Sequence, residues 1–405
     1  MTASETSVLW PTTDALRTAV QQFMDETGFP GAAILVAMPG HETWAEGFGI
    51  ADRETGAPMQ TDMRLRVGSV TKTFTGTIVL QLVDEGTLSL DDTLAEMLPE
   101  AADLPHAEAI TLRQILNMRS GVFNYTEHPG LFGNVPGHED RVWTLAEMID
   151  IARKHDAYFE PGADFHYSNT NYILLEMIVE RATGNAFGDE LKARVLEPLG
   201  LTATSLPTTP DMPEPFAHGY GGDPAQMNPV QDPDAEVVEA DTPSGASDAE
   251  AEKPAPAKID LAALRDSTRF PPSLAAGAGA IVSTVHDLDR WVDALLAGWS
   301  LTPDTQAARM ELLPTKESET DDTGGYGLGI MRQEGVTGHG GGILGYTCFA
   351  GRHDASGTNV VILTNGEGNG TEEGSVIGLL RAIVRLLPSN DSTDDAVAAE
   401  PEATA

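Results

Sequence analysis

The sequence contains a single cysteine, Cys348, and this shortage excludes two kinds of site. One cysteine cannot form a disulfide within the chain, and it cannot build a cysteine-based zinc site. The neighbouring residues, YTCFA, are typical of a β-strand. We therefore interpret Cys348 as a small core side chain rather than as a reactive thiol.

Positive charge is scarce as well. Lysine and arginine together number 24 against 62 aspartates and glutamates, so the formal net charge is −38, and six residues are lysine. A surface of this sign makes nucleic acids and anionic membranes poor partners. The acidity fits adaptation to high salt, and it fits equally well a GC-rich genome combined with acidic tails. In both cases the charge bears on solubility rather than on function.

Long apolar runs are also missing. No run of about 18 apolar residues occurs, so we expect no membrane-spanning helix. The first residues, MTASETSVLWPTTD, lack the basic and then apolar regions of a secretory signal. The sequence as it stands predicts a cytoplasmic protein, or an extracellular one if a signal peptide has been removed. The 405 residues suit one large enzyme or two interlocked lobes, which we expect to be monomeric.

Several motifs that identify other enzyme classes are absent. The sequence has no G-x-S-x-G, so the nucleophile elbow of α/β-hydrolases is missing. It has no H-E-x-x-H, no G-x-x-x-x-G-K-[ST] and no G-x-G-x-x-G before a helix. Zinc-protease, P-loop and dinucleotide-binding functions therefore have no support, and we expect neither a cofactor nor a metal.

The hydrophobic periodicity predicts strands at both ends of the chain and helices between them. We expect helices over 13–28, 71–85, 111–118, 144–154, 170–182, 287–296 and 371–387. We expect strands over 32–38, 42–50, 278–283, 327–331, 343–350 and 359–363. This order predicts an α+β fold in which residues 1–75 and 275–388 build one antiparallel sheet flanked by helices, and residues 76–274 form an inserted, mainly helical lobe.

Two segments differ in composition from the rest. Residues 207–258 become acidic, proline-rich and of low complexity, so we expect a solvated surface loop, disordered near 223–258. Residues 389–405 are polar and should form a disordered tail. The long loop could instead serve as a binding segment, but its composition favours a solvated excursion that the chemistry does not need.

The first candidate for chemistry is Ser69-Val70-Thr71-Lys72. At helical spacing, Ser69 and Lys72 lie on one face, at the start of a strongly apolar helix. A helix N-terminus favours developing negative charge, and burial lowers the pKa of a lysine towards that of a usable base. This arrangement can activate a serine without histidine. A capping serine beside a surface lysine is the plainer interpretation of this motif taken alone.

The second candidate is Tyr167-Ser168-Asn169 in the segment FEPGADFHYSNTNY. A tyrosine and an asparagine two residues apart can face the same side of an extended turn. The phenol of Tyr167 can relay a proton, and the Asn169 amide can bind a substrate amide. Alternatively, Ser168 or Asn169 caps the helix that begins at Thr170, and both roles are compatible.

The third candidate is the glycine-rich run from Gly338 to Gly342, which contains His339 and precedes the expected strand ILGYTCFAG. Glycines beside a strand permit the close backbone approach that pairing with a substrate requires. His339 can donate a hydrogen bond to such a site. Alternatively, the run is a hairpin turn with a bystander histidine.

In their order and spacing, these three motifs resemble those of the serine β-lactamase and DD-peptidase family, whose members carry S-x-x-K, then S-D-N or its equivalent, then K-T-G. The sequence is similar to the branch with Tyr-x-Asn in second place. That branch contains class C β-lactamases, D-alanyl-D-alanine carboxypeptidases, D-aminopeptidases and related esterases. The segments RVGSVTKTF, LQLVDEG, YSNTNY, STVHDLD and GYGLG look like those of the carboxypeptidases, and the likeness extends over nearly the whole chain.

The resemblance implies a β-lactamase/transpeptidase-like fold and a role for each motif. Ser69 would attack a carbonyl to form an acyl-enzyme, while Lys72 and Tyr167 would handle its proton. Asn169 would bind the substrate's amide. On the third motif, His339 and Gly341 would contact substrate and Gly342 would form the oxyanion hole, its N–H acting together with that of Ser69.

Two departures concern substrate specificity. Where the carboxypeptidases carry threonines that hold a terminal carboxylate, this chain has Gly340 and Gly342, and where they carry an arginine it has Met331, with Arg332 adjacent. We therefore expect a serine hydrolase acting on D-amino-acid peptides, β-lactams, or small esters and amides. The alternatives are an esterase or D-aminopeptidase on the same fold, or a catalytically silent relative that binds penicillin or peptide.

Overall fold

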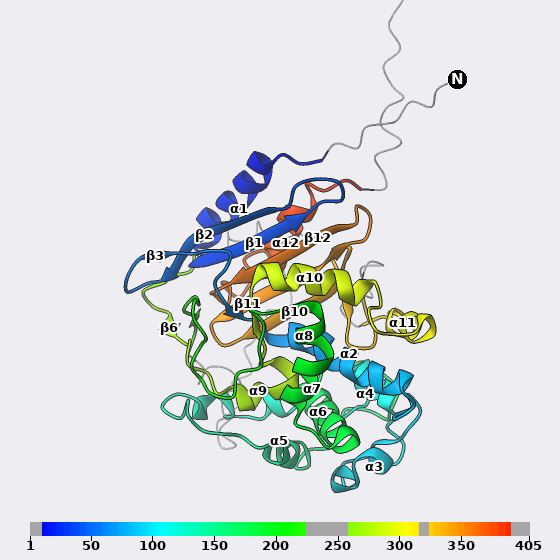
Figure 1. Cartoon of the computed structure of the whole chain (residues 1–405). Helices are drawn as coiled ribbons and strands as arrows, with labels where there is room; N and C mark the ends of the chain where they lie inside the picture. The colour runs from blue at the N-terminus through cyan, green and yellow to red at the C-terminus, as the bar shows by residue number, and fades with distance from the viewer. Residues whose placement is uncertain (1–9, 224–257, 316–323, 390–405) are drawn as a thin grey trace, which may run out of the picture.

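The computed structural model describes residues 10–223, 258–315 and 324–389. Its centre is an eight-stranded sheet in the order β3-β2-β1-β12-β11-β10-β9-β8, and the strand pairs are antiparallel (Figure 1). The strands are β1 (Gly31–Ala37), β2 (Trp44–Asp52), β3 (Ala57–Pro58), β8 (Gly325–Tyr326), β9 (Met331–Gln333), β10 (Val336–Ile343), β11 (Tyr346–His353) and β12 (Thr358–Thr364). The predicted antiparallel sheet built from both ends of the chain is thus confirmed.

The central strands are buried on both faces, which explains their nearly continuous apolar sequences. Successive side chains of a strand point to opposite faces. Ile34 and Val36 of β1 accordingly join the core under α1 (Thr13–Thr27) and α12 (Val376–Val384), while Ala33 and Leu35 join the larger core on the other face. On that second face, α10 (Val285–Leu296) crosses β1, β11 and β12.

The remaining helices form a layer next to this second face, with α2 (Thr71–Asp84) at its centre (Figure 1). α2 is buried almost all round, because it packs against α6, α7 and α9. The other members are α3 (Leu94–Met97), α4 (Leu112–Leu116), α5 (Leu145–Ala152), α6 (Asn169–Thr183), α7 (Phe187–Leu191), α8 (Glu197–Leu199), α9 (Pro272–Gly279) and α11 (Pro303–Arg309). One continuous hydrophobic core joins the sheet to this layer. Because the core does not divide there, the lobe boundaries expected near residues 75 and 275 remain a prediction.

Four predicted elements differ from the observed ones. The strand expected over 278–283 is only β7 (Val282–Ser283), which pairs with β4 (Leu65–Arg66), because residues up to Gly279 belong to α9. Of the strand expected over 327–331, residues 327–330 form the turn between β8 and β9, where Gly329 has φ 74°, and Met331 begins β9. The last helix is shorter than 371–387, since α12 begins only after the N-cap Ser375.

The fourth difference concerns the glycine-rich run. Residues 338–342 are not a turn before a strand but lie inside β10, hydrogen-bonded to β11 along their whole length. The chain reverses later, at Leu344 and Gly345, where Gly345 has φ 81°. The hairpin turn considered as an alternative is therefore wrong: glycine is rare inside strands, but pairing with β11 and close contact with neighbouring backbone keep the run extended.

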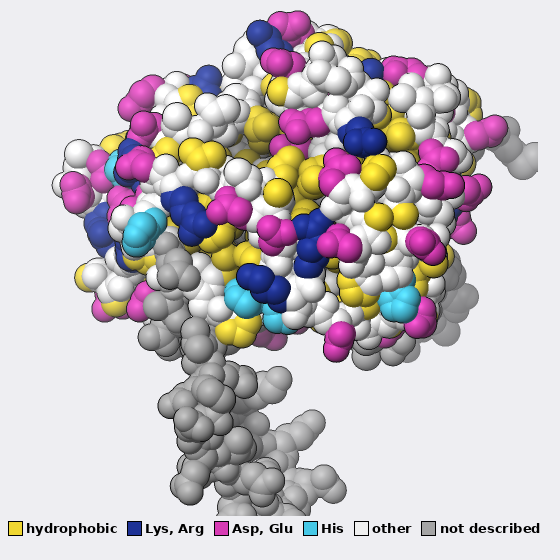
Figure 2. Space-filling view, turned by 90° about the horizontal axis from the view of Figure 1, so that it is seen from below, with side chains coloured by type: hydrophobic (Ala, Val, Ile, Leu, Met, Phe, Trp, Pro, Cys, Tyr) yellow, Lys and Arg dark blue, Asp and Glu magenta, His cyan; other side chains and the backbone are white. Residues whose placement is uncertain are grey.

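The acidic loop and the tail fall mostly outside the described residues, at 224–257 and 390–405. The described start of the loop is part of the fold, because β5 (Tyr220–Gly221) pairs with β6 (Arg265–Asp266). On the face seen in Figure 2, acidic side chains are spread with basic ones between them, and apolar side chains lie in its recesses. Within the described ranges, no helix combines the length and apolar character needed to cross a membrane.

Candidate active site

Ser69 is placed by a short 3₁₀ turn, Gly68–Val70, that leads directly into α2. This turn lies against β10. Gly68 has φ 47°, and a Cβ on it would lie 2.7 Å from the amide nitrogen of Gly342. Only glycine fits both this backbone conformation and this contact. The close approach brings the backbone of Ser69 next to the glycine-rich strand.

Lys72 is fully buried one helical turn after Ser69. Its Nζ lies 2.9 Å from Ser69 Oγ, and it donates to Asn169 Oδ1 at 2.7 Å and to the carbonyl oxygen of Ala278 at 2.7 Å. Burial lowers the pKa of Lys72 well below its usual value, and these partners carry no negative charge to oppose the shift. The arrangement favours a neutral amine beside the serine hydroxyl.

Tyr167 and Asn169 lie at the start of α6, next to Lys72. The Lys72 Nζ lies 4.9 Å from the centre of the Tyr167 ring. The Tyr167 hydroxyl is buried without a hydrogen bond of normal geometry to the described part of the chain. Burial raises the pKa of Tyr167, and the nearby Ser69 hydroxyl opposes the shift only in part. The phenol is therefore protonated at neutral pH.

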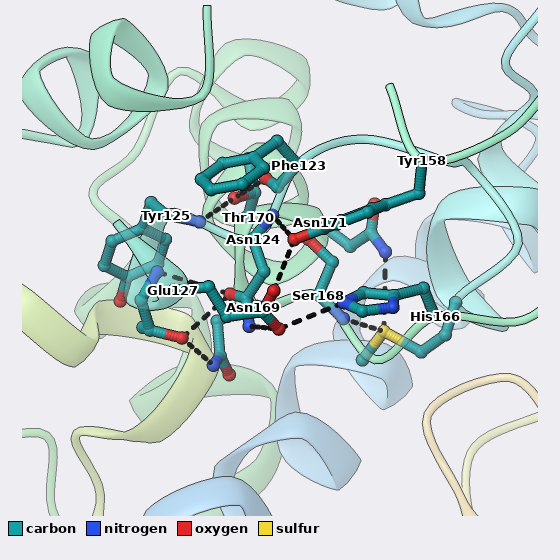
Figure 3. Close-up of polar contacts among 12 residues, drawn as sticks. Phe123, Asn124, Tyr125, Glu127, Tyr158, His166, Ser168, Asn169, Thr170 and Asn171 are labelled. Atoms are coloured by element: carbon teal, nitrogen blue, oxygen red, sulfur yellow. Dashed lines mark hydrogen bonds and ion pairs between the residues drawn. The ribbon is translucent and has the colours of Figure 1, made fainter. Parts of the chain in front are cut away.

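Asn169 is held by the segment that follows α4. Its backbone N–H donates to Asn124 Oδ1 at 3.0 Å, and its Nδ2 donates to Thr126 Oγ1 at 3.0 Å (Figure 3). Ser168 occupies the N-cap position of α6, as one alternative expected. Its side chain, however, makes no capping hydrogen bond. The Asn169 side chain instead spans Lys72 and Thr126.

On β10, the structure separates the three predicted residues. Gly342 lines a cavity that also contains Ser69. Gly341 faces inward, where a Cβ would lie 2.1 Å from the Val67 carbonyl oxygen and 3.1 Å from the amide nitrogen of Ser69. Gly341 therefore lets the strand approach the turn that carries Ser69, and no larger residue fits there.

His339 lies behind the cavity rather than on its wall, and it is buried. Its Nδ1 donates to the Gly340 carbonyl oxygen at 2.6 Å, which leaves Nε2 to accept from the Tyr326 hydroxyl at 3.0 Å. Burial, with a smaller contribution from the charge of Lys72, lowers the pKa of His339 to about 3. The imidazole is therefore neutral and supports β10 through Tyr326.

The cavity has a volume of about 440 Å³, and Ser69, Asn169 and Gly342 lie on its wall. Most of the wall is apolar, formed by Phe132, Phe270, Leu274, Ile343, Leu344 and Tyr346. Among the described residues that line it, the charged side chains are Glu127 and Glu367, and none is a lysine or arginine. A cavity of this kind attracts cations and disfavours anions.

Glu127 was not predicted from the sequence. It accepts hydrogen bonds from Asn124 Nδ2 at 3.0 Å, from Tyr158 Oη at 2.6 Å and from His166 Nε2 at 3.0 Å (Figure 3). Burial raises the pKa of Glu127, but these hydrogen bonds outweigh it and leave the pKa below its usual value. Its partners are scattered over more than 30 residues of sequence, so no local motif marks it.

Glu367 was missed for the same reason. Its carboxylate accepts from the N–H of Gly345 at 2.7 Å and from the N–H of Gly222 at 3.1 Å. These donors come from the β10–β11 turn and from the residue after β5, which are far from Glu367 in sequence. Backbone amides hold this carboxylate at the cavity without neutralising its charge.

The residues considered for holding a substrate carboxylate point elsewhere. Arg332 Nε lies 2.7 Å from Asp354 Oδ2, and the Met331 sulfur accepts from the Gly340 N–H at 3.5 Å. Neither residue lines the cavity. Over the described segments, no group of three or more His, Cys, Asp or Glu side chains is arranged to hold a metal ion.

The chain is similar to several known proteins. The penicillin-binding protein 4 of Amycolatopsis lactamdurans is 36% identical over 192 residues, which cover 46% of each chain. Esterase EstB of Burkholderia gladioli is 29% identical over 368 residues, or 85% of this chain and 88% of the esterase. A D-stereospecific amidohydrolase from Streptomyces sp. has a solved structure that matches with a TM-score of 0.74 at 29% identity, covering 93% of this chain and 98% of that one.

The first curated relatives are matched over less than half of their own length. The family model described as Beta-lactamase, in contrast, matches residues 16–384, which include the sheet, the helical layer and the three motifs. The chain therefore belongs to the β-lactamase family.

Proposed function

We propose that the protein is a serine hydrolase that forms an acyl-enzyme on Ser69. The observation that carries the proposal is the contact of 2.9 Å between the Ser69 hydroxyl and the buried amine of Lys72, on the wall of a cavity large enough for a small substrate. Attack by Ser69 Oγ on an amide or ester carbonyl forms the new C–O bond, and departure of the amine or alcohol leaves the acyl group on Ser69. Water then releases the acid.

The directions of the pKa shifts support different roles for the two neighbours of Ser69. The lowered pKa of Lys72 suits a general base that accepts the serine proton. The raised pKa of Tyr167 suits a neutral phenol, which passes a proton towards the leaving group rather than starting the attack. A base with a lowered pKa and a phenol that stays protonated can divide proton acceptance and proton donation between them.

Negative charge on the tetrahedral intermediate needs N–H donors. We place the oxyanion hole at the backbone amides of Ser69 and Gly342. The contact of the Gly68 turn with Gly342 supports this assignment, and so does the distance of 3.1 Å between a Cβ at Gly341 and the Ser69 nitrogen. The N-terminal end of α2 adds a favourable dipole. Asn169, bonded to Lys72, would orient the substrate amide.

The charge of the cavity favours substrates without a free terminal carboxylate. Its two carboxylates, Glu127 and Glu367, would repel such a group and attract an ammonium group. The relatives include a D-stereospecific amidohydrolase and an esterase, whose names fit substrates of this kind. We infer that small amides or esters are the substrates, and that those with a free amino group are preferred over those with a free carboxylate.

A peptide ending in D-Ala-D-Ala should be a poorer substrate than its C-terminal amide. An enzyme that lacks two carboxylate contacts, each worth roughly 1.5–3 kcal/mol, should have a kcat/KM for the free acid at least about a hundredfold lower than an enzyme that makes them. The ratio of kcat/KM for the two peptides tests this, and a strong preference for the free acid would contradict it. The double variant Gly340→Thr plus Gly342→Thr should shift the ratio towards the acid. A Cβ at Gly340 meets Phe349 at an ordinary 3.5 Å, and one at Gly342 meets Thr347 at 4.0 Å.

Replacing Glu127 by glutamine should weaken hydrolysis of substrates with a free amino group by about three- to tenfold, mainly through KM, as expected for a partly exposed charge pair. The same substrates carrying an acetylated amine should be hydrolysed equally well by both proteins, because they lack the charge. Glu54→Gln, an exposed change outside the cavity, serves as the control. An equal loss on both substrate types would show that Glu127 supports the fold rather than recognises charge.

A further inference from the structure

The catalytic scheme leaves one buried carboxylate unused, that of Glu176 on α6. Only 8% of Glu176 is exposed, and no lysine or arginine of the described chain forms an ion pair with it. Burial raises its pKa to about 7, partly opposed by a hydrogen bond from the Gly277 N–H and reinforced by the charge of Glu180. Burying a carboxylate without a cationic partner lowers the free energy of unfolding. Stability alone therefore does not explain why Glu176 is present.

Glu176 holds a break in α9, which lies beside α6 and next to α2 (Figure 1). The Gly277 N–H donates to Glu176 Oε2 at 2.5 Å. The residue before it, Ala276, has φ 43° and ψ −139°, a strained backbone conformation for a residue with a side chain. Strain of this kind persists only where the surroundings hold it, and Glu176 is one of the groups that do.

The residues after the break contact the catalytic helix. The Gly277 carbonyl oxygen accepts from Thr75 Oγ1 at 2.7 Å, and the Ala278 carbonyl oxygen accepts from Lys72 Nζ at 2.7 Å. Two consecutive residues of α9, Gly277 and Ala278, therefore connect the Glu176 carboxylate to the Lys72 amine. Gly277 is also required sterically, because a Cβ on it would lie 3.0 Å from Glu176 Oε2 and 3.3 Å from Glu176 Cβ.

We propose that Glu176 is a positioning residue for Lys72: by holding the Gly277 N–H, it aims the Ala278 carbonyl at the Lys72 amine and so keeps that amine beside Ser69. The inference rests on the proposed role of Lys72 as the base. Glu176 does not line the cavity, so it acts on the proton-transfer step rather than on substrate binding. The titratable groups that act on it or that it acts on are Glu180 on its own helix and Tyr125, which begins the 3₁₀ turn Tyr125–Glu127, while α9 contains no titratable side chain.

Glu176→Gln and Glu176→Met separate positioning from charge and from folding. Glutamine keeps an oxygen that accepts from Gly277 and should retain kcat within about threefold, whereas methionine removes the acceptor and should lower kcat by about ten- to a hundredfold with KM nearly unchanged. In the methionine variant the acidic limb of the kcat profile should move to lower pH. The ammonium form of Lys72 loses an acceptor there, so its pKa falls.

Glu180→Met is the matched control. Glu180 lies one turn later on the same helix and accepts from the Phe187 N–H at 3.0 Å, so its loss removes a comparable bond that leads to α7 and not to α9. Gly277→Ala tests the contact between Glu176 and Gly277 from the α9 side. Its methyl group pushes against Glu176, so this variant should also lower kcat and move the acidic limb to lower pH. The kcat and the acidic limb of its pH profile are measured for each variant, and thermal unfolding checks that each variant is folded.

A folded Glu176→Met protein with the kcat and the acidic limb of the wild type would overturn the proposal. If methionine does not allow folding, an unchanged acidic limb in Gly277→Ala would do the same. A shift in the Glu180→Met control equal to that of Glu176→Met would also overturn it, because it would indicate a general effect of α6. Absence of any acyl-enzyme on wild-type Ser69 would instead refute the proposed function itself.

Discussion

Ser69→Ala is expected to abolish hydrolysis and covalent labelling while the fold is kept. The change removes the only hydroxyl that contacts the Lys72 amine among the described residues, so no acyl-enzyme can form, and kcat/KM should fall by at least about a thousandfold. Ser69 is partly exposed at the cavity and its hydroxyl is not part of the core, so thermal unfolding should change little. Mass spectrometry after reaction with a fluorophosphonate or a slow β-lactam should place the adduct on the peptide that contains Ser69.

Ser267→Ala is a suitable control. Its hydroxyl is buried without a hydrogen-bond partner in the described part of the chain, and Ser267 lies outside the Ser69 cavity, so this variant should label and hydrolyse like the wild type. An adduct on any serine other than Ser69 would contradict the assignment. A wild-type protein that binds penicillin without forming an adduct would favour the alternative of a silent relative.

Lys72→Met and Lys72→Arg should each lower kcat by at least about a thousandfold, comparable to loss of Ser69. Residues that act as one catalytic unit have non-additive effects, so removal of one costs about as much as removal of all. Methionine fills the space but accepts no proton, and arginine stays charged at any working pH. Lys154→Arg, at the exposed end of α5, makes the same substitution outside the site and should have no effect. Near-normal kcat in the Arg variant would rule out a neutral base at this position.

Lys72 also predicts how stability depends on pH. The pKa of Lys72 is lowered in the folded state, so between that value and its usual value the unfolded chain binds more protons than the folded one. The free energy of unfolding should therefore rise with pH across this window, and Lys72→Met should remove this rise. Chemical unfolding at several pH values measures the difference between the two proteins. An equally steep rise in the Met variant would show that another group causes it.

Much of the catalytic arrangement follows from local pattern. The helix periodicity placed Ser69 and Lys72 on one face, and the apolar sequence of α2 implied that Lys72 is buried, as the structure confirms. The Tyr167–Asn169 segment was located correctly at the start of α6. The glycine-rich run was expected just before a strand, whereas hydrogen bonding to β11 places it inside one.

The charge of the cavity could not be predicted in this way. Glu127 and Glu367 are ordinary acidic residues among 62 in a chain of net charge −38, and nothing in their neighbourhood marks them. Their positions depend on donors such as Tyr158, His166 and Gly222, which the fold brings together from separate segments. The same holds for Arg332, whose adjacency to Met331 suggested a carboxylate partner, whereas in the fold it pairs with Asp354.

By itself, the sequence indicated the Ser69–Lys72 pair and the strands and helices with strong periodicity, because each depends on residues within one or two turns of helix or one strand. It indicated the family through the order and spacing of three motifs. Only the tertiary structure decided that Ala278 binds Lys72, that Glu176 holds the break in α9, and that His339 is buried behind the cavity. Each of these contacts joins segments that are far apart in the chain or on different strands. Their free energies come from packing and desolvation that no local window contains.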